Sequence, residues 1–271
     1  MTDTNPDRRW HPHPFIIFSA LLHAGAALAT LWNPGLWPWA LGAAAADQGV
    51  LTLAGLWPRS RILGPNWTAL PRAAAARGEV AITIDDGPDP LVTPAVLDVL
   101  ERHGAKATFF CIGERALLYP DLCREIARRG HGVENHSFRH RYGFAGSGLR
   151  GFVRELAMAQ EALAAVTGSH PRFFRAPFGL RNPLLDPALS RLGLRLASWS
   201  RRGFDTRDRD PAAVSRRLLR GLKAGDILLL HDGNSARAAD GAPVILHVLP
   251  PLLDTIAAEG LRPVTLAEAL R

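Results

Sequence analysis

The sequence predicts an α/β protein, a distorted (β/α) barrel of about seven parallel strands preceded by an N-terminal apolar helical hairpin. Residues 79–271 alternate short β-rich runs with helical patterns, which is typical of parallel strands joined by helices. Residues 15–57 contain two long apolar stretches, no Lys or Arg, and a single acidic residue. The hydrophobic content of 47% is that of a packed protein and excludes a disordered chain.

Each repeat of the barrel is predicted as a strand followed by a helix. The strands are expected at 79–84, 106–111, 132–134, 172–175, 195–199, 226–230 and 262–264. The helices are expected at 92–103, 114–129, 150–166, 211–220 and 245–259. The functional groups of such barrels gather at the carboxyl ends of the strands, so we expect the catalytic or binding residues at those ends.

The apolar hairpin is predicted to anchor the protein in a membrane. As helices, residues 15–32 and 36–57 would span about 27 Å and about 33 Å, close to the bilayer core of about 30 Å. A turn is predicted at Asn33-Pro34-Gly35, and tryptophans lie near the helix ends, as is typical of membrane interfaces. Asp47 in the second stretch favours an alternative, a water-soluble helical pair packed on the domain.

The basic residues around the hairpin predict its orientation. Arg8 and Arg9 precede it, Arg59 and Arg61 follow it, and the connecting turn has no basic residue. The positive-inside rule then places both ends in the cytoplasm, so we expect a bacterial-type inner membrane protein with its globular domain on the cytoplasmic face. The predicted segments are a basic tail (1–14), a two-helix anchor (15–57), a linker (58–78) and the barrel domain (79–271).

Charge and cysteine content exclude two other classes of protein. The net charge of +7 is moderate, and the chain contains no zinc finger, basic helical arm or aromatic-interleaved basic motif, so no nucleic-acid partner is expected. Cys111 and Cys123 lack metal-ligand spacing and are predicted to be small core residues.

Two adjacent carboxylates, Asp85 and Asp86, end the first predicted strand, "VAITID". Like charges side by side repel, so the pair is either a solvated turn or the partner of something positive. Successive residues of a strand point to opposite faces, so Asp86 can join Asp85 only if the Gly87-Pro88 turn re-aims it. A divalent cation would make the pair favourable, with one carboxylate as ligand and the other as a free base.

Two histidines follow the third predicted strand, in "ENHSFRH". In a helical turn, the spacing of His136 and His140 would bring both imidazoles to one face. Two imidazoles and one carboxylate suit a catalytic zinc with an open position. The pair alone is a weak signal, and two ordinary surface histidines remain the alternative.

Three further strand ends carry polar groups. "RFFRAPFG" contains Arg175, "ASWSRRGFDTRD" contains Asp205, and "GDILLLHDG" contains His231 after an apolar run. Singly, these residues could be a helix-end cap, a turn former and a core histidine. Taken together at the strand ends, they favour one catalytic site.

In this order, "TIDDGP", "HSFRH", "RAPF", "FDTRD" and "LLLHD" strongly resemble the polysaccharide deacetylase family, that is, the NodB-homology domain or carbohydrate esterase family four. The resemblance covers roughly residues 79–267. It implies a distorted (β/α) barrel and the metal-dependent removal of N-acetyl groups from amino sugars.

The resemblance also implies roles for single residues. Asp86, His136 and His140 are similar to the family's metal ligands, usually of zinc, with cobalt, manganese or nickel as alternatives. Asp85 is similar to the family's general base, and Arg175 to the residue that holds this base. His231 is similar to the general acid, and Asp205 to the residue that orients it. The backbone N–H of Phe178 is similar in position to the oxyanion donor, and Leu229 to a wall of the acetyl pocket.

The chain departs from the family pattern at one position. Arg209 follows Asp208 where the family usually has Trp, which puts the wall of the acetyl pocket in doubt. Trp199 is expected to fill that space, and Pro177 is included among the substrate-binding residues.

Nine arginines between 191 and 220 bear on the substrate. They form either a solvated basic face or a contact with phosphates, since guanidinium binds phosphate bidentately. The expected partners are therefore an N-acetylated amino-sugar glycan or a lipid-linked sugar, and the membrane. Two alternatives are a periplasm-facing deacetylase of cell-wall or exopolysaccharide glycan, and a non-catalytic glycan-binding protein of the same fold.

Overall fold

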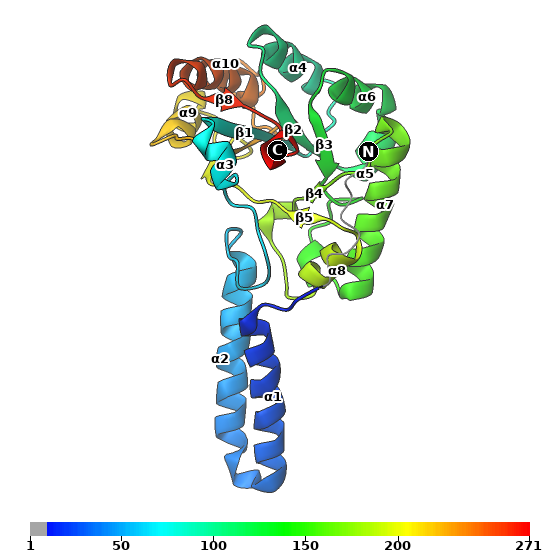
Figure 1. Ribbon diagram of the computed structural model, residues 1–271, viewed down its shortest axis with the longest axis vertical. Helices are drawn as coiled ribbons and strands as arrows, with labels where there is room; N and C mark the ends of the chain where they lie inside the picture. Colours follow the sequence, from blue (N-terminus) through cyan, green and yellow to red (C-terminus); the bar gives the residue numbers. More distant parts are fainter. Residues whose placement is uncertain (1–9) are drawn as a thin grey trace.

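In the computed structural model, which describes residues 10–271, the strands form one curled parallel sheet (Figure 1). Its order is β5-β4-β3-β2-β1-β7-β6, and β8 pairs with the start of β1. The strands are β1 (Glu79–Asp85), β2 (Ala107–Cys111), β3 (Gly132–Asn135), β4 (Phe173–Phe174), β5 (Arg195–Leu196), β6 (Arg201–Arg202), β7 (Ile227–His231) and β8 (Arg262–Pro263). Predictions for Arg8, Arg9 and the tail up to residue 9 lie outside the described residues.

The predicted fold class is confirmed. Each of the seven expected strands is present, and every pairing is parallel. The strand that the sequence did not predict is β6, which consists of two arginines paired with Leu228 and Leu229. Two charged residues carry no β-strand signal, so only the tertiary pairing defines this strand.

The barrel is left open between its edge strands, β5 and β6, which are joined by residues 197–200 alone. Trp67 covers the β5 edge, because its N–H donates to the carbonyl of Leu196 and its carbonyl accepts from the N–H of Ser198. Its ring packs edge-on against Phe173 at 5.1 Å. The segment 58–78 therefore packs against the barrel and is not a free linker.

Helices surround the sheet, and two further helices form the N-terminal hairpin. The expected helix 114–129 is two helices, because Pro120 begins a new one, and two short helices, α3 and α8, were not predicted. The α-helices are α1 (Pro14–Trp32), α2 (Trp37–Leu56), α3 (Arg72–Ala76), α4 (Thr93–Arg102), α5 (Gly113–Leu118), α6 (Pro120–Arg128), α7 (Leu149–Thr167), α8 (Leu185–Arg191), α9 (Pro211–Leu219) and α10 (Val244–Ala258).

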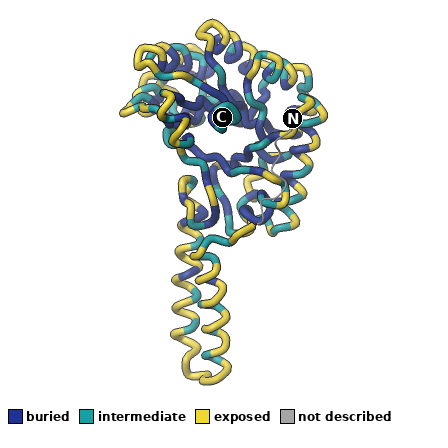
Figure 2. Tube along the Cα trace, in the orientation of Figure 1, coloured by how far each residue is buried: buried dark blue, intermediate teal, exposed yellow. Residues whose placement is uncertain are grey.

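The central strand β1 is buried along its whole length (Figure 2). Val80, Ile82 and Ile84 pack into the apolar core shared with the surrounding helices, whereas Ala81 belongs to the cluster inside the barrel. This alternation is the one expected for the strand, and it directs Asp85 toward the barrel interior. Cys111 and Cys123 are buried and free, as predicted.

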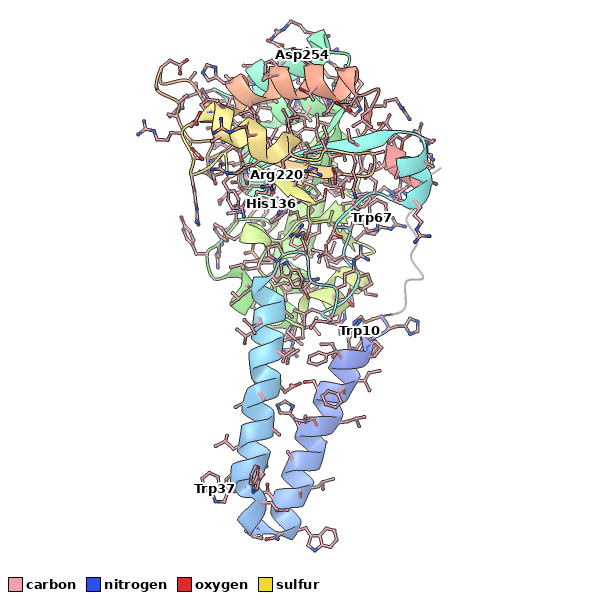
Figure 3. All side chains as sticks on the ribbon, turned by 90° about the vertical axis from the view of Figure 1, so that its left-hand side faces the viewer. Trp10, Trp37, Trp67, His136, Arg220 and Asp254 are labelled. Carbon is pink, nitrogen blue, oxygen red and sulfur yellow. The ribbon has the colours of Figure 1, made fainter. Side chains whose placement is uncertain are left out.

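Helices α1 and α2 form an antiparallel hairpin that projects from the barrel domain (Figure 1). Most of its apolar side chains face outward and are exposed (Figure 2). Trp37 is exposed at its tip and Trp10 at its base (Figure 3). Trp32 and Trp39 are also exposed, near the turn between the helices, and Trp57 directly follows α2. Within residues 10–271, only α1 is both long and apolar enough to cross a membrane by length and composition; α2 falls short.

Asp47 faces the partner helix and is buried in the hairpin. The Oγ of Ser19 donates a hydrogen bond to its Oδ2, and the Nδ1 of His23 lies 3.7 Å from the same oxygen. The carboxylate is thus turned away from the outer surface of the hairpin.

The base of the hairpin is built into the barrel domain. Gly55, near the end of α2, has no room for a side chain, because a Cβ there would lie 2.3 Å from the carbonyl oxygen of Arg181. The carbonyl of Pro58 accepts a hydrogen bond from the Oγ of Ser198, and Trp10 donates to Asp186. The hairpin is therefore fixed to the loops near β5 and α8.

Candidate active site

The register of the two central strands places an acid beside a histidine. Strands β1 and β7 pair in parallel, with Asp85 opposite His231 at their carboxyl ends. Both side chains are buried. The end of β3 lies two strands away and leads directly into His136. The expected gathering of polar groups at the strand ends is thus present in the fold.

Arg175 holds Asp85 in place. Its Nη1 donates to Asp85 Oδ1 at 2.7 Å and also to the Oγ1 of Thr83. Its other nitrogens donate to the carbonyls of Ala197 and Ser198. Burial lowers the pKa of Arg175, and the adjacent Asp85 opposes this shift. Arg175 therefore occupies one oxygen of Asp85 and leaves the other, Oδ2, toward His136.

Asp86 turns to the same side as Asp85 because its backbone adopts a left-handed conformation, with φ of 74°. Its buried Oδ1 has no hydrogen-bond partner within residues 10–271, but it lies 3.2 Å from the Nε2 of both His136 and His140. Burial by itself raises the pKa of Asp86, but the surrounding histidines, His136, His231 and His140, hold it below its usual value.

The two histidines meet through a bend, and the helical turn expected between them is absent. Ser137 and His140 have φ of 64° and 49°, which folds residues 136–140 back on themselves. The two rings lie 4.7 Å apart. The Nδ1 of His136 must donate to the carbonyl of Arg175, so Nε2 is the ring nitrogen that faces Asp86 and can offer a lone pair when the ring is in the matching neutral tautomer.

The ligand atoms of Asp86, His136 and His140 all lie within 4.8 Å of one another. Burial, with the charge of His136, lowers the pKa of His140 to about 4, so its ring is neutral near pH 7. A carboxylate and two imidazoles around an unsatisfied buried oxygen fit a divalent cation. These three residues could hold one.

His231 forms a second acid–base pair with Asp205. The Nδ1 of His231 lies 2.9 Å from Asp205 Oδ1, and its backbone N–H donates to Oδ2 at 2.7 Å. Burial by itself lowers the pKa of His231, but the charge and hydrogen bond of Asp205, together with Asp85 and Asp86, raise it to about 9. His231 is thus protonated at neutral pH.

One cavity of about 360 Å³ joins these groups. Asp85, Asp86, His136, His140 and His231 all line it. Arg175 and Asp205 stand behind Asp85 and His231 and do not line it. The predicted substrate-contacting residues Phe178, Leu229 and Trp199 are in its wall, but Pro177 is not; its neighbours Ala176 and Gly179 are.

Phe178 reaches the cavity through an unusual backbone conformation, with φ of 58°. Its ring packs edge-on against His140 at 4.8 Å and stacks on Tyr142 at 5.3 Å. Trp199 lines the cavity, and Arg209 is directed away from it, donating instead to the carbonyl of Arg237.

Several wall residues were not assigned to the site from the sequence, although Arg202 and Arg207 are among the nine arginines noted between 191 and 220. Asn234 donates to Asp86 Oδ2 at 3.1 Å, and Tyr142, Arg202, Thr206 and Arg207 also line the cavity. Asn234 lies three residues after His231 in "HDGN", and this proximity was the only available signal. The other four belong to loops or to the unpredicted strand β6.

A curled parallel sheet with these acid–base groups at its carboxyl edge is the architecture of a carbohydrate deacetylase, and comparison with known proteins agrees. A family model described as polysaccharide deacetylase matches residues 72–197. A chitooligosaccharide deacetylase of Azorhizobium caulinodans is 36% identical over 168 residues, covering 60% of this chain and 77% of that protein. A peptidoglycan-N-acetylglucosamine deacetylase of Bacillus cereus is 33% identical over 194 residues, covering 71% and 88%.

The chain therefore belongs to the polysaccharide deacetylase family, and its class of activity is carbohydrate N-deacetylation. A solved structure agrees with this assignment: the family 4 carbohydrate esterase from Streptomyces lividans, in complex with acetate, is 30% identical. It matches with a TM-score of 0.62 over 69% of this chain and 91% of that one.

Proposed function

We propose that this protein is a metal-dependent, membrane-associated hydrolase that removes an N-acetyl group from an amino sugar of a glycan or glycolipid. The observation that carries the proposal is the buried Asp86 Oδ1, which lacks a hydrogen-bond partner within the described residues and faces two imidazole nitrogens at 3.2 Å. Asp85 lies directly beside this group and is held by Arg175.

Asp86, His136 and His140 are the residues that would hold the cation. Zinc suits this donor set best, and cobalt, manganese or nickel are alternatives. When bound, the cation supplies Lewis acidity and lowers the pKa of water from 15.7 toward about 7. Asn234 and the carbonyl of Arg175 orient the ligands by binding the other ends of Asp86 and His136.

Asp85 is the proposed general base. Its Oδ1 is occupied by Arg175, so Oδ2 takes the proton of water as the water oxygen attacks the acetyl carbon. The carbonyl double bond opens, and negative charge develops on its oxygen. The backbone N–H of Phe178 is the proposed donor to that oxygen, and such donors are worth about 3–4 kcal/mol each.

His231 is the proposed general acid. It passes a proton from Nε2 to the amide nitrogen as the C–N bond breaks, which releases the amine of the sugar and acetate. Asp205 binds the opposite nitrogen and so positions the ring. Leu229 and Trp199 are the proposed walls around the acetyl methyl group.

The hairpin is the proposed membrane anchor. Its outer face is apolar, exposed tryptophans lie at both ends, Asp47 is turned inward, and α1 alone is about 28 Å long. The basic residues beside it favour a cytoplasmic domain, whereas a deacetylase of peptidoglycan would face the other side. Residue-specific labelling of single-cysteine variants in intact cells distinguishes the two sides, and complete extraction of the chain by alkaline carbonate would contradict the anchor.

The enzymatic proposal predicts metal-dependent release of acetate. Purified full-length protein in detergent is expected to release acetate from N-acetylglucosamine oligomers or from a lipid-linked N-acetylamino sugar. A chelator is expected to abolish the release, and added zinc, cobalt, manganese or nickel to restore it. Binding of these sugars with no acetate released under any ion would favour the non-catalytic glycan-binding alternative and contradict the proposal.

The state of His231 predicts a pH dependence. The proposed acid must be protonated, so kcat is expected to fall as pH rises through the pKa of His231. Asp205 is the main group that raises this pKa, so Asp205→Asn is expected to move the fall to lower pH and to reduce kcat. The control is Asp254→Asn at an exposed carboxylate outside the cavity. An unchanged alkaline limb in Asp205→Asn would contradict the assigned pair.

A further inference from the structure

Arg202 lies in the wall of the catalytic cavity, on the edge strand β6. Its neighbour Arg201 is fully engaged: it forms an ion pair with Asp226 and donates to the carbonyls of Arg220 and Gly221. Successive residues of a strand point to opposite sides, so Arg201 belongs to the outer face and Arg202 to the cavity. The two adjacent arginines therefore have different surroundings.

Among residues 10–271, the guanidinium of Arg202 contacts aromatic rings and has no polar partner. The Cζ of Arg202 lies 5.3 Å from the ring centroid of Trp199 and 4.9 Å from that of Phe204, so two aromatic rings hold the guanidinium in position. Within the part of the chain that the structure describes, Arg202 makes no side-chain hydrogen bond or ion pair, and its Nε is buried without a partner. A half-buried guanidinium with unsatisfied donors is poised for an acceptor from outside the chain.

Neighbouring carboxylates do not neutralise the charge of Arg202 by direct ion pairing. Burial lowers the pKa of Arg202, and Asp205, Asp85 and Asp86 oppose the shift only through their charge at a distance. None of the three forms an ion pair with it within 4.0 Å. Arg202 is thus near the acidic groups of the site without being bound to them.

The surroundings of Arg202 extend the positive charge toward the outside. Arg207 lines the same cavity and is also part of an adjoining surface depression that includes Phe204, Arg209 and the ion pair of Arg217 with Asp208. Guanidinium groups therefore outnumber carboxylates in the depression beside the cavity. Such an excess of positive charge attracts oxyanions and repels cations.

We propose that Arg202 binds an anionic oxygen group, a phosphate or a carboxylate, carried by the N-acylated amino sugar while its acyl group occupies the catalytic centre. This inference rests on the proposed function and narrows its substrate class to acidic amino sugars or sugar phosphates. The planar guanidinium, fixed between two rings, presents paired N–H donors that match both oxyanions. Arg202 is then a specificity-determining residue.

The test compares three N-acetylated disaccharides: N,N′-diacetylchitobiose (hereafter chitobiose), its 1-phosphate, and a disaccharide in which N-acetylmuramic acid supplies a carboxylate. Wild type in its metal-loaded form is expected to show a KM at least about 10-fold lower for one of the acidic substrates than for chitobiose. Arg202→Gln is expected to remove that difference, because it lowers kcat/KM on the preferred acidic substrate far more than on chitobiose. The substrate that loses its advantage identifies phosphate or carboxylate as the group bound.

Two further variants separate recognition from folding. Arg202→Lys keeps the charge but not the paired donors, so it is expected to retain only part of the preference. Arg216→Gln removes an exposed arginine of α9 outside the cavity and is expected to behave as wild type. Inorganic phosphate is expected to inhibit chitobiose deacetylation by wild type more strongly than by Arg202→Gln if phosphate is the bound group.

Three outcomes would overturn the inference. These are equal KM values of wild type for neutral and acidic substrates, an equal loss in Arg202→Gln on all three, and a preference that persists in Arg202→Gln. In each case wild type still releases acetate, so the proposed function stands. If wild type releases no acetate from any substrate with any ion, the proposed function itself fails.

Discussion

Asp85→Asn is expected to bind a divalent cation nearly as well as wild type and to lose deacetylase turnover by a factor of about 10²–10⁴, the usual contribution of a general base. The substitution keeps the size of the side chain and an oxygen for Arg175. It removes only the ability to take a proton, and it leaves Asp86, His136 and His140 unchanged.

The buried charge of Arg175 makes a stability control necessary. Arg175 retains Thr83 and the carbonyls of Ala197 and Ser198 as acceptors, but it loses its anionic partner. Breaking a buried pair costs up to about 3–5 kcal/mol, so thermal unfolding is measured beside activity and rates are taken well below the transition. Asp98→Asn, at a surface ion pair with Arg129, is the matched control. Turnover near wild type in folded, metal-loaded Asp85→Asn would contradict the base assignment.

His136→Ala is expected to lose both the bound cation and the activity. Of the two histidines it is the more deeply buried, and its Nδ1 is fixed by the carbonyl of Arg175, so its Nε2 is oriented toward Asp86. Removing it leaves one imidazole and one carboxylate, too few for a stable site. Metal content after dialysis and acetate release are the two measurements.

The control for this variant is His247→Ala, which removes an exposed histidine of α10 that pairs with Asp240 and does not line the catalytic cavity. It is expected to keep metal and rate. The two proposed roles thus differ in their signatures, because Asp85→Asn separates metal binding from turnover and His136→Ala removes them together. Metal bound at full occupancy in His136→Ala would contradict the ligand set.

The sequence predicted the strand ends well because burial and chemistry change there over one or two residues. The apolar run 227–230 followed by His231 and the run 80–84 followed by Asp85 both mark the point where a buried strand meets the cavity. The parallel arrangement then brings such ends together, whatever their separation along the chain.

Features set by backbone conformation or tertiary contact were not predictable. The positive φ of Asp86 and Phe178 reverses the side-chain direction that a regular strand or helix would give. The bend that joins His136 and His140 replaced the helical turn inferred from their spacing. Strand β6 pairs only because β7 is beside it, so the position of Arg202 in the cavity left no trace in residue pattern.

The join between hairpin and barrel has a mechanical consequence. A Cβ on Gly179 would lie 2.7 Å from the ring of Trp199 and 2.8 Å from Pro58, so Pro58, the first residue after the hairpin, packs closely against Gly179 of the cavity wall. With the hairpin inserted as proposed, these contacts restrict rotation of the barrel domain relative to the hairpin. The opening of the catalytic cavity is held at one height and one tilt above the lipid, and substrates are selected partly by whether their scissile group reaches that level.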